Sequence, residues 1–330
     1  MSDDDVTRVL EAGDLIGRYP RDPTDQTTDG LIEGTFGLAV RGEDVYVLDA
    51  VAGSILRFDL EARLVERVGR RGQGPGELSA PTSIAAGPRG ELWVGDPAAN
   101  RLTRFVRASP GAFETLSPAY PPVNVGLSPG GVPVVPTMSA MTLLARVTSD
   151  GVRDLAVDPA AVPTEVSSGP LDRMSMRGLM LARLDDTSMA MLQNRHGTEF
   201  RLWRVRLSAA EDSISGIEPL PLPRWLYTIL EEETEAVRRT VPAEFAEGDF
   251  LIPFKGMHAN RGRLWLVPTP SSRIIALAVD GSGPMTAVVG GPGITGGLLD
   301  AAVVEERLIA LYETELRVYR LDERRGAFEP

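Results

Sequence analysis

The sequence predicts an all-β protein, because short apolar runs alternate with glycine-containing turns along most of its 330 residues. One phrase recurs: an apolar run, a turn, a second apolar run often centred on an aromatic residue, another turn and an alternating third run. Its clearest copies lie at 37–60, 83–106 and 256–279. The 34 Gly and 26 Pro are spread between these runs, as many short strands require.

The spacing of the phrase predicts six sheets. The repeat recurs about every 40 to 50 residues, with two longer intervals, and such a period is typical of a four-stranded propeller blade. We therefore predict a six-bladed β-propeller that forms a single domain over residues 1–330. The middle of each second run falls, in order, at Tyr46, Trp93, Pro133, Ala190, Trp265 and Ile309.

Six blades follow one another along the chain. Blade three is expected to be irregular, because Pro133 and Pro136 cannot donate to a strand ladder. Blade six is one strand short, and we expect residues 6–12 to supply that strand and to close the ring by pairing the two chain ends. The blades are expected at 36–70, 83–118, 123–158, 176–220, 251–289 and from 298 to the C-terminus.

One helical insertion, 224–250, is expected between blades four and five. Apolar residues recur at helical intervals over 224–241, and Glu235 can pair with Arg239 one turn later. The insertion links an outermost strand to the next innermost strand, so it should lie on the face where the channel opens. Packing on the rim of the ring and covering the channel as a lid both remain open.

The composition of the chain limits the kinds of partner that we expect it to bind. The net charge of −12, from 46 acidic and 34 basic residues, repels phosphate backbones, so nucleic acid is not expected as a partner. No apolar run is long enough to span a membrane, and the N-terminus lacks the features of a signal peptide. A soluble chain is expected. Its compartment stays open between the cytoplasm and, if a leader was removed, export to the periplasm.

Chemistry-bearing residues are predicted at one end of the ring. The innermost strands all begin on the same face, so their first residues surround the mouth of the central channel. The only lysine of the chain, Lys255, falls there, as does His258, one of two histidines. The other candidates at this mouth are Glu33, Thr35, Thr82, Asn124, Arg177 and Asp300.

The segment 69–105 resembles an NHL-type repeat, found in a broad group of bacterial six-bladed propellers. The resemblance covers most of the chain and is strongest in blades one, two and five. It implies the propeller fold and a binding or scaffold role, and many members of the group are exported. It does not imply a particular chemistry.

A second, weaker resemblance is to the gluconolactonase and strictosidine synthase-like propellers. Glu33-Gly34, the phrase from Asn124 to Gly131, and Pro253-Phe254-Lys255-Gly256-Met257 are similar to three phrases that hold a divalent metal in the lactonases. Lys255 stands where the third metal ligand, an aspartate, would be. A cation at this position disfavours a calcium site, so no cofactor is expected, although a divalent cation such as calcium in the channel stays open.

The residues leave three functions open. The first is the binding of a small molecule or peptide at the channel mouth, with Thr35, Thr82, Asn124, Arg177 and Asp300 as ligand-binding residues. The second is a lactone or ester hydrolase, or a condensing enzyme, with Glu33, Lys255 and His258 as its catalytic set. The third is a scaffold that docks a protein partner. An ion pair between Glu33 and Lys255 would serve binding or catalysis, or would only order the mouth.

Overall fold

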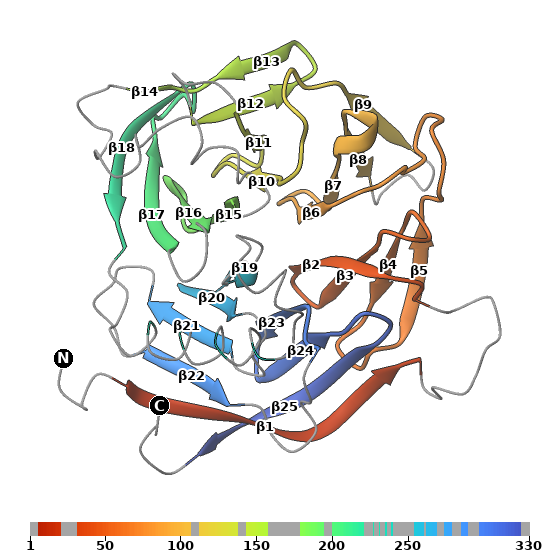
Figure 1. The fold of residues 1–330 in the computed structure, drawn as a ribbon, viewed down its shortest axis with the longest axis vertical. Coiled ribbons are helices and arrows are strands. Elements are labelled where there is room, and N and C mark those ends of the chain that lie inside the picture. Colours follow the sequence, from red (N-terminus) through yellow and green to blue (C-terminus); the bar gives the residue numbers. More distant parts are fainter. Residues whose placement is uncertain are drawn as a thin grey trace.

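The protein is a ring of six antiparallel blades around a central channel, as a computed structural model shows (Figure 1). The all-β class and the six-bladed propeller are thus confirmed. The structure describes residues 6–20, 32–106, 112–137, 143–157, 179–194, 200–220, 254–260, 262–268, 274–278, 285–289 and 297–324, together with Tyr227, Glu231, Glu235 and Arg239.

The first three blades each contain four strands, which run in order from the channel to the rim. Blade one is β2 (Thr35–Arg41), β3 (Asp44–Asp49), β4 (Ser54–Phe58) and β5 (Leu64–Val68). Blade two is β6 (Ser83–Ala86), β7 (Glu91–Asp96), β8 (Arg101–Val106) and β9 (Phe113–Leu116), with a short 3-10 helix, η2 (Pro97–Ala99). Blade three is β10 (Gly126–Leu127), β11 (Pro133–Pro136), β12 (Leu144–Thr148) and β13 (Gly151–Asp154).

Blades four to six complete the ring. Blade four is β15 (Leu179–Arg183), β16 (Ser188–Asn194), β17 (Phe200–Leu207) and β18 (Ser213–Pro219). Blade five is β19 (Phe254–Asn260), β20 (Arg263–Pro268), β21 (Ile274–Ala278) and β22 (Met285–Val289). Blade six contains β23 (Asp300–Val304), β24 (Arg307–Leu311) and β25 (Leu316–Arg324).

The N-terminal strand β1 (Val6–Tyr19) lies along the outside of blade six. It pairs antiparallel with β25, from Val9 opposite Arg324 to Tyr19 opposite Leu316. It is longer than the expected segment 6–12, and its first half also pairs parallel with β22 of blade five. Blades five and six therefore share one eight-stranded sheet, an arrangement the repeat did not predict.

Two further outcomes concern the blade boundaries. The segment expected to end blade three contains β14 (Ala156–Val157), which pairs parallel with β18 and so belongs to blade four, where it covers an outer edge. The helical insertion expected at 224–250 lies outside the described residues apart from Tyr227, Glu231, Glu235 and Arg239, of which the first three have helical conformation and the last lies in a turn. Of the contacts expected there, the Glu235–Arg239 pair is present at 3.5 Å.

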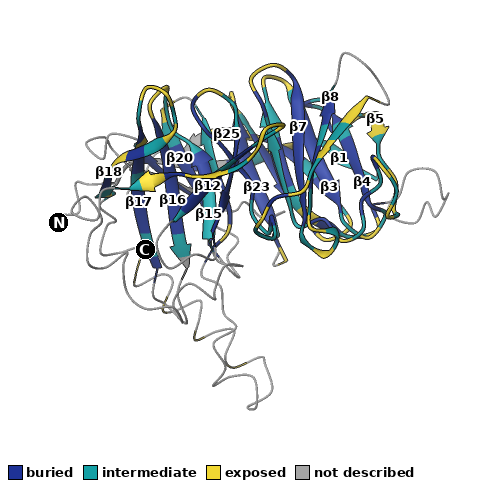
Figure 2. Cartoon of the chain, turned by 90° about the horizontal axis from the view of Figure 1, so that it is seen from above, coloured by how far each residue is buried: buried dark blue, intermediate teal, exposed yellow. Residues whose placement is uncertain are grey.

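The hydrophobic core is divided among the blade interfaces. The described residues form six buried clusters, each shared by two neighbouring blades. Strands such as β3 and β7 are buried on both faces because each blade packs between two others, and the exposed residues lie mainly at the turns (Figure 2). All six second-run markers fall within second strands, which confirms the period.

Candidate functional site

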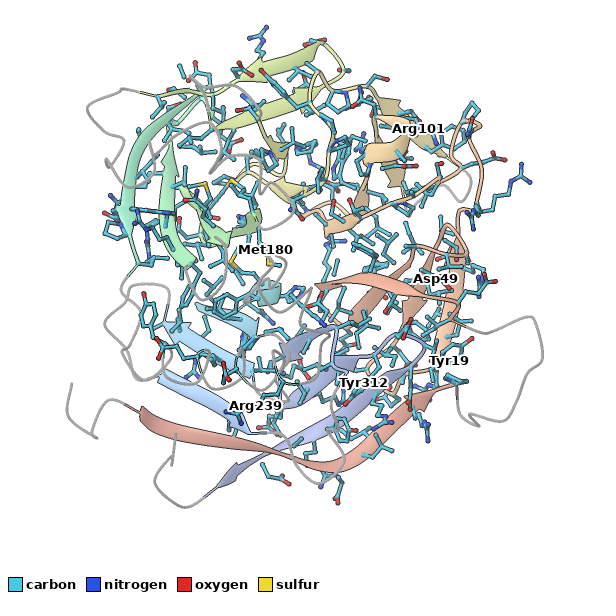
Figure 3. The ribbon with its side chains drawn as sticks, in the orientation of Figure 1. Tyr19, Asp49, Arg101, Met180, Arg239 and Tyr312 are labelled. Carbon is cyan, nitrogen blue, oxygen red and sulfur yellow. The ribbon has the colours of Figure 1, made fainter. Side chains whose placement is uncertain are left out.

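A cavity of about 510 Å³ occupies the central channel. All six innermost strands line it: β2, β6, β10, β15, β19 and β23. Several residues of the wall are small, including Gly37, Ala85, Gly126 and Ala259. Met180 also borders the channel, near the centre of the ring in Figure 3. The volume is in the range of small-molecule sites.

A histidine and a carboxylate from neighbouring blades meet in this cavity. The Nε2 atom of His258, on β19, lies 2.8 Å from Oδ1 of Asp300, the first residue of β23. The Asp300 side chain is only 8% exposed, and that of His258 is 18% exposed. Asp300 also accepts the backbone N–H of Leu38 at 3.0 Å and its neighbour Ala301 at 2.8 Å, so its carboxylate joins blades five, six and one.

Gly256 makes room for this pair. Gly256 and His258 are two residues apart on β19, so their side-chain directions fall on the same side of the strand. A Cβ atom on Gly256 would lie 1.9 Å from Oδ1 of Asp300, far closer than two unbonded atoms can approach. The missing side chain is therefore the local condition that lets Asp300 reach His258.

The protonation of His258 follows from its partner. An ionised carboxylate only accepts hydrogen bonds, so Nε2 of His258 carries the proton and donates it to Asp300. Burial lowers the pKa of His258, but the charge of Asp300 and the hydrogen bond together outweigh burial and raise the pKa above its ordinary value. Within the described part of the chain Nδ1 has no hydrogen-bond partner, so neutral His258 presents a free acceptor.

Lys255 stands at a break in the strand pairing. Phe254 pairs with Pro268 and Gly256 with Val267, so Lys255 is an extra residue without a partner across the strand. Such a bulge redirects a side chain. The side chain is exposed to solvent, yet nearby protein atoms displace part of its hydration, and this burial lowers the pKa of Lys255. Among the described residues Lys255 forms no ion pair.

Five of the eight expected site residues line the cavity: Thr82, Asn124, Lys255, His258 and Asp300. Thr82 also donates its hydroxyl to the carbonyl of Val123 at 2.7 Å, which ties blade two to blade three. Arg177 lies outside the described residues.

Glu33 and Thr35 do not belong to the described cavity wall. Thr35 is buried and donates its hydroxyl to the carbonyl of Tyr312 at 2.9 Å, a link between blades one and six. Glu33 is exposed, and its backbone N–H donates to Asp49 at 2.9 Å. The expected pairing of Glu33 with Lys255 is not found among the described residues, and the carboxylate of Asp300 pairs with His258.

The glycine-rich segment 71–78, which links blades one and two, is a turn fixed by hydrogen bonds from a side chain. Arg101 donates to the carbonyls of Gln73, Gly74 and Glu77 at 2.8 to 3.0 Å, so carbonyl oxygens of this link face a cation. This pattern is opposite to that of a phosphate-binding loop, which points N–H groups inward. The glycine-rich segment 290–297, which links blades five and six in the same way, lies outside the described residues apart from Gly297.

Sequence reasoning missed most residues of the wall, Phe36 among them, and one pairing. Phe36 lines the cavity and is 61% exposed, an unusual state for a phenylalanine. Its position before Gly37, matching Lys255 before Gly256, was the available signal. The signal for the His258–Asp300 pairing was the position of Asp300 in its hairpin. Asp300 lies four residues before the last paired residue of β23, and the equivalent positions in blades one and five are Gly37 and Gly256.

No group of three His, Cys, Asp or Glu side chains that could hold a metal ion occurs within the ranges that the structure describes. In those same ranges no helix is long and apolar enough to cross a membrane.

Comparison with known proteins identifies the fold. No family model matches the chain, and no curated protein matches its sequence. Among solved structures, a gluconolactonase from Xanthomonas campestris has a TM-score of 0.54 at 13% identity, over 88% of this chain and 86% of that one. The virginiamycin B lyase from Staphylococcus aureus has a TM-score of 0.51 at 15% identity, over 94% and 98%. A luciferin-regenerating enzyme gives 0.51 at 15%, over 97% and 98%.

These likenesses show that the chain has the propeller fold of gluconolactonase-like and virginiamycin B lyase proteins. The expected resemblance to gluconolactonase propellers is confirmed at this level. At such identities the shared feature is the architecture, and the chemistry of the channel is argued from its own residues.

Proposed function

We propose that the protein binds a small molecule in its central channel. The observation that supports this most is the cavity of about 510 Å³ in which a buried His258–Asp300 pair and the cation of Lys255 face common space. Concave cavities in which a few polar groups converge beside apolar side chains are the usual form of small-molecule sites.

A protein-docking role has less support. The large apolar side chains exposed among the described residues include Leu15 on β1, Val65 on β5 and Phe113 on β9, which lie on different outer strands. Docking surfaces are expected to be contiguous apolar patches.

A cavity-filling variant tests the binding proposal. An added Cβ at Gly37 would lie 3.6 Å from Cγ2 of Ile84, an ordinary contact, so a larger side chain is introduced at this position of the cavity wall, and folding of Gly37→Leu is checked by circular dichroism. A set of small organic molecules is screened by thermal shift against the wild type. Ligands of the channel should lose their shift in Gly37→Leu and keep it in Gly216→Leu, whose site on β18 is open. Equal shifts in all three proteins would contradict binding in the channel.

A second candidate, favoured by the His258–Asp300 pair, is an enzyme that opens a lactone or ester. Neutral His258 would take a proton from water on Nδ1 while the water oxygen forms its bond to the carbonyl carbon. Lys255 would stabilise the negative oxygen of the intermediate. Cleavage of the ring C–O bond would follow, and His258 would return the proton to the leaving oxygen. Enzyme names among the similar folds, a gluconolactonase and a lyase, are compatible with this candidate.

The enzyme candidate is tested with a panel of simple lactones in a pH-stat. His258→Gln should lower any observed rate by about a hundredfold or more, the usual value of a general base. Because the base must be unprotonated, the rate should rise with pH through the raised pKa of His258. Hydrolysis that is unchanged in His258→Gln would reject this mechanism, and binding in the channel would stand by itself.

A further inference from the structure

We propose that the channel ligand is a small organic anion with an apolar body, an inference that rests on the proposed binding function. The anionic group of the ligand binds Lys255, and its apolar part contacts Phe36. Two equivalent bulges, the charges of the wall and its apolar surface support this class of ligand.

Phe36 and Lys255 occupy the same place in blades one and five. On β2 the pairing shifts between Thr35 and Gly37, and on β19 it shifts between Phe254 and Gly256. Each extra residue therefore lies at the start of an inner strand, is followed by a glycine, lines the cavity and is exposed. A bulge costs strand pairing, and here both bulges turn side chains of complementary chemistry toward the same space. One is an aromatic ring and the other is a cation.

The charges of the described cavity wall single out Lys255. Three cations, Arg41, Arg183 and Lys255, face three carboxylates, Glu43, Asp300 and Glu305, so the wall is balanced although the chain carries −12. Arg41 donates to a backbone carbonyl, and Arg183 pairs with Asp186 at 2.6 Å. Lys255 has neither kind of partner within the described residues. A partly desolvated ammonium is best satisfied by an anionic group of the ligand.

The rest of the wall suits an apolar body. Between the mouth and the opposite end of the channel, the lining contains flexible thioethers and aliphatic groups, which adapt to a ring or chain of varied shape. They are Ile84, Val125, Met180, Leu181 and Met257.

Two fluorescent dyes test the ligand class. Anilinonaphthalene sulfonate carries two aromatic ring systems and one anionic group, and phenylnaphthylamine has the same rings without the charge. Both should bind the folded wild type, and the Gly37→Leu variant should lose both. Lys255→Met should weaken the sulfonate by about twofold to fivefold while leaving the neutral dye unchanged. Phe36→Ala should weaken both dyes by about threefold to tenfold.

Matched controls separate these effects from general changes of charge or surface. Arg153→Met removes one exposed cation from the outer strand β13, and Phe113→Ala removes an exposed aromatic from β9. Neither should alter dye binding. Folding of every variant is checked by circular dichroism and by its melting temperature.

The outcomes distinguish this inference from the binding proposal. If the neutral dye binds in the channel but Lys255→Met and Arg153→Met affect the sulfonate equally, the channel binds small molecules and the anionic class is wrong. If Phe36→Ala changes neither dye, the aromatic contact is wrong. If neither dye binds the wild type, or both bind Gly37→Leu equally well, the apolar anion class and its location in the channel are both rejected.

Discussion

Replacing Gly256 with alanine should disrupt the His258–Asp300 pair while both of these residues stay unmutated. The added Cβ would lie 1.9 Å from Oδ1 and 2.9 Å from Cγ of Asp300, and 3.1 Å from Cγ2 of Val267. The carboxylate must therefore move by about 1 Å or more to reach an ordinary contact distance. That displacement would break or lengthen its 2.8 Å hydrogen bond to His258.

The loss of unfolding free energy expected in Gly256→Ala has two parts. Forcing an extra carbon into a packed interior costs about 1–3 kcal/mol. A weakened hydrogen bond to a buried charged group costs about 1.5–3 kcal/mol, and the two parts overlap because relief of one strains the other. We expect Gly256→Ala to lower the free energy of unfolding by about 2–4 kcal/mol.

Urea unfolding followed by circular dichroism measures this change. Gly216→Ala is the matched control, because its strand position has no atom within 4 Å of the added Cβ, and it should be neutral or slightly stabilising. In Gly256→Ala, NMR titration should also show a lower pKa for His258. Equal stability of the two variants, with an unchanged pKa, would refute the account of how Gly256 positions the pair.

Three further outcomes are expected. In Asp300→Asn the pKa of His258, followed by NMR, should fall below its ordinary value because burial remains while the opposing charge is gone; an unchanged pKa would contradict the pairing. The folded-state pKa of His258 is raised, so the pairing stabilises the fold at pH values below the ordinary histidine pKa, and this stabilisation is lost as pH rises through the raised pKa. The destabilisation caused by His258→Gln should therefore shrink between weakly acidic and alkaline pH. Thr35→Val should cost about 1 kcal/mol in urea unfolding through its lost bond to Tyr312, and dye binding should be unaffected; a loss of binding would place Thr35 in the site.

The fold could be predicted from the sequence because each blade repeats the same local pattern. The second strands around Tyr46, Trp93 and Trp265 are apolar and end at turn residues, so their type and spacing are local properties. The strand β1 was harder to define. Its need followed from the missing strand of blade six, but its extension to Tyr19 and its parallel pairing with β22 depend on two edges that meet only in the closed ring.

The candidate site could be predicted only to the level of a neighbourhood. Counting strands placed Lys255, His258 and Asp300 at the channel, where they all lie. The partners of each residue depend on how neighbouring blades pack. Asp300 reaches His258 because Gly256 lacks a side chain, whereas Glu33 stays outside the described cavity wall. The position of Asp300 relative to its hairpin turn indicates that it faces the channel, but its contact with His258 depends on packing between blades.

The most direct test of the channel site is NMR of the His258 side chain in the presence of a small ligand. The chain has two histidines, so His258→Gln assigns the resonance without ambiguity. In the free protein the imidazole should titrate above its ordinary pKa, and phenylnaphthylamine should shift its signals in the wild type but not in Gly37→Leu. An ordinary pKa, together with signals that the dye leaves unchanged, would contradict a ligand site built around His258 and Asp300.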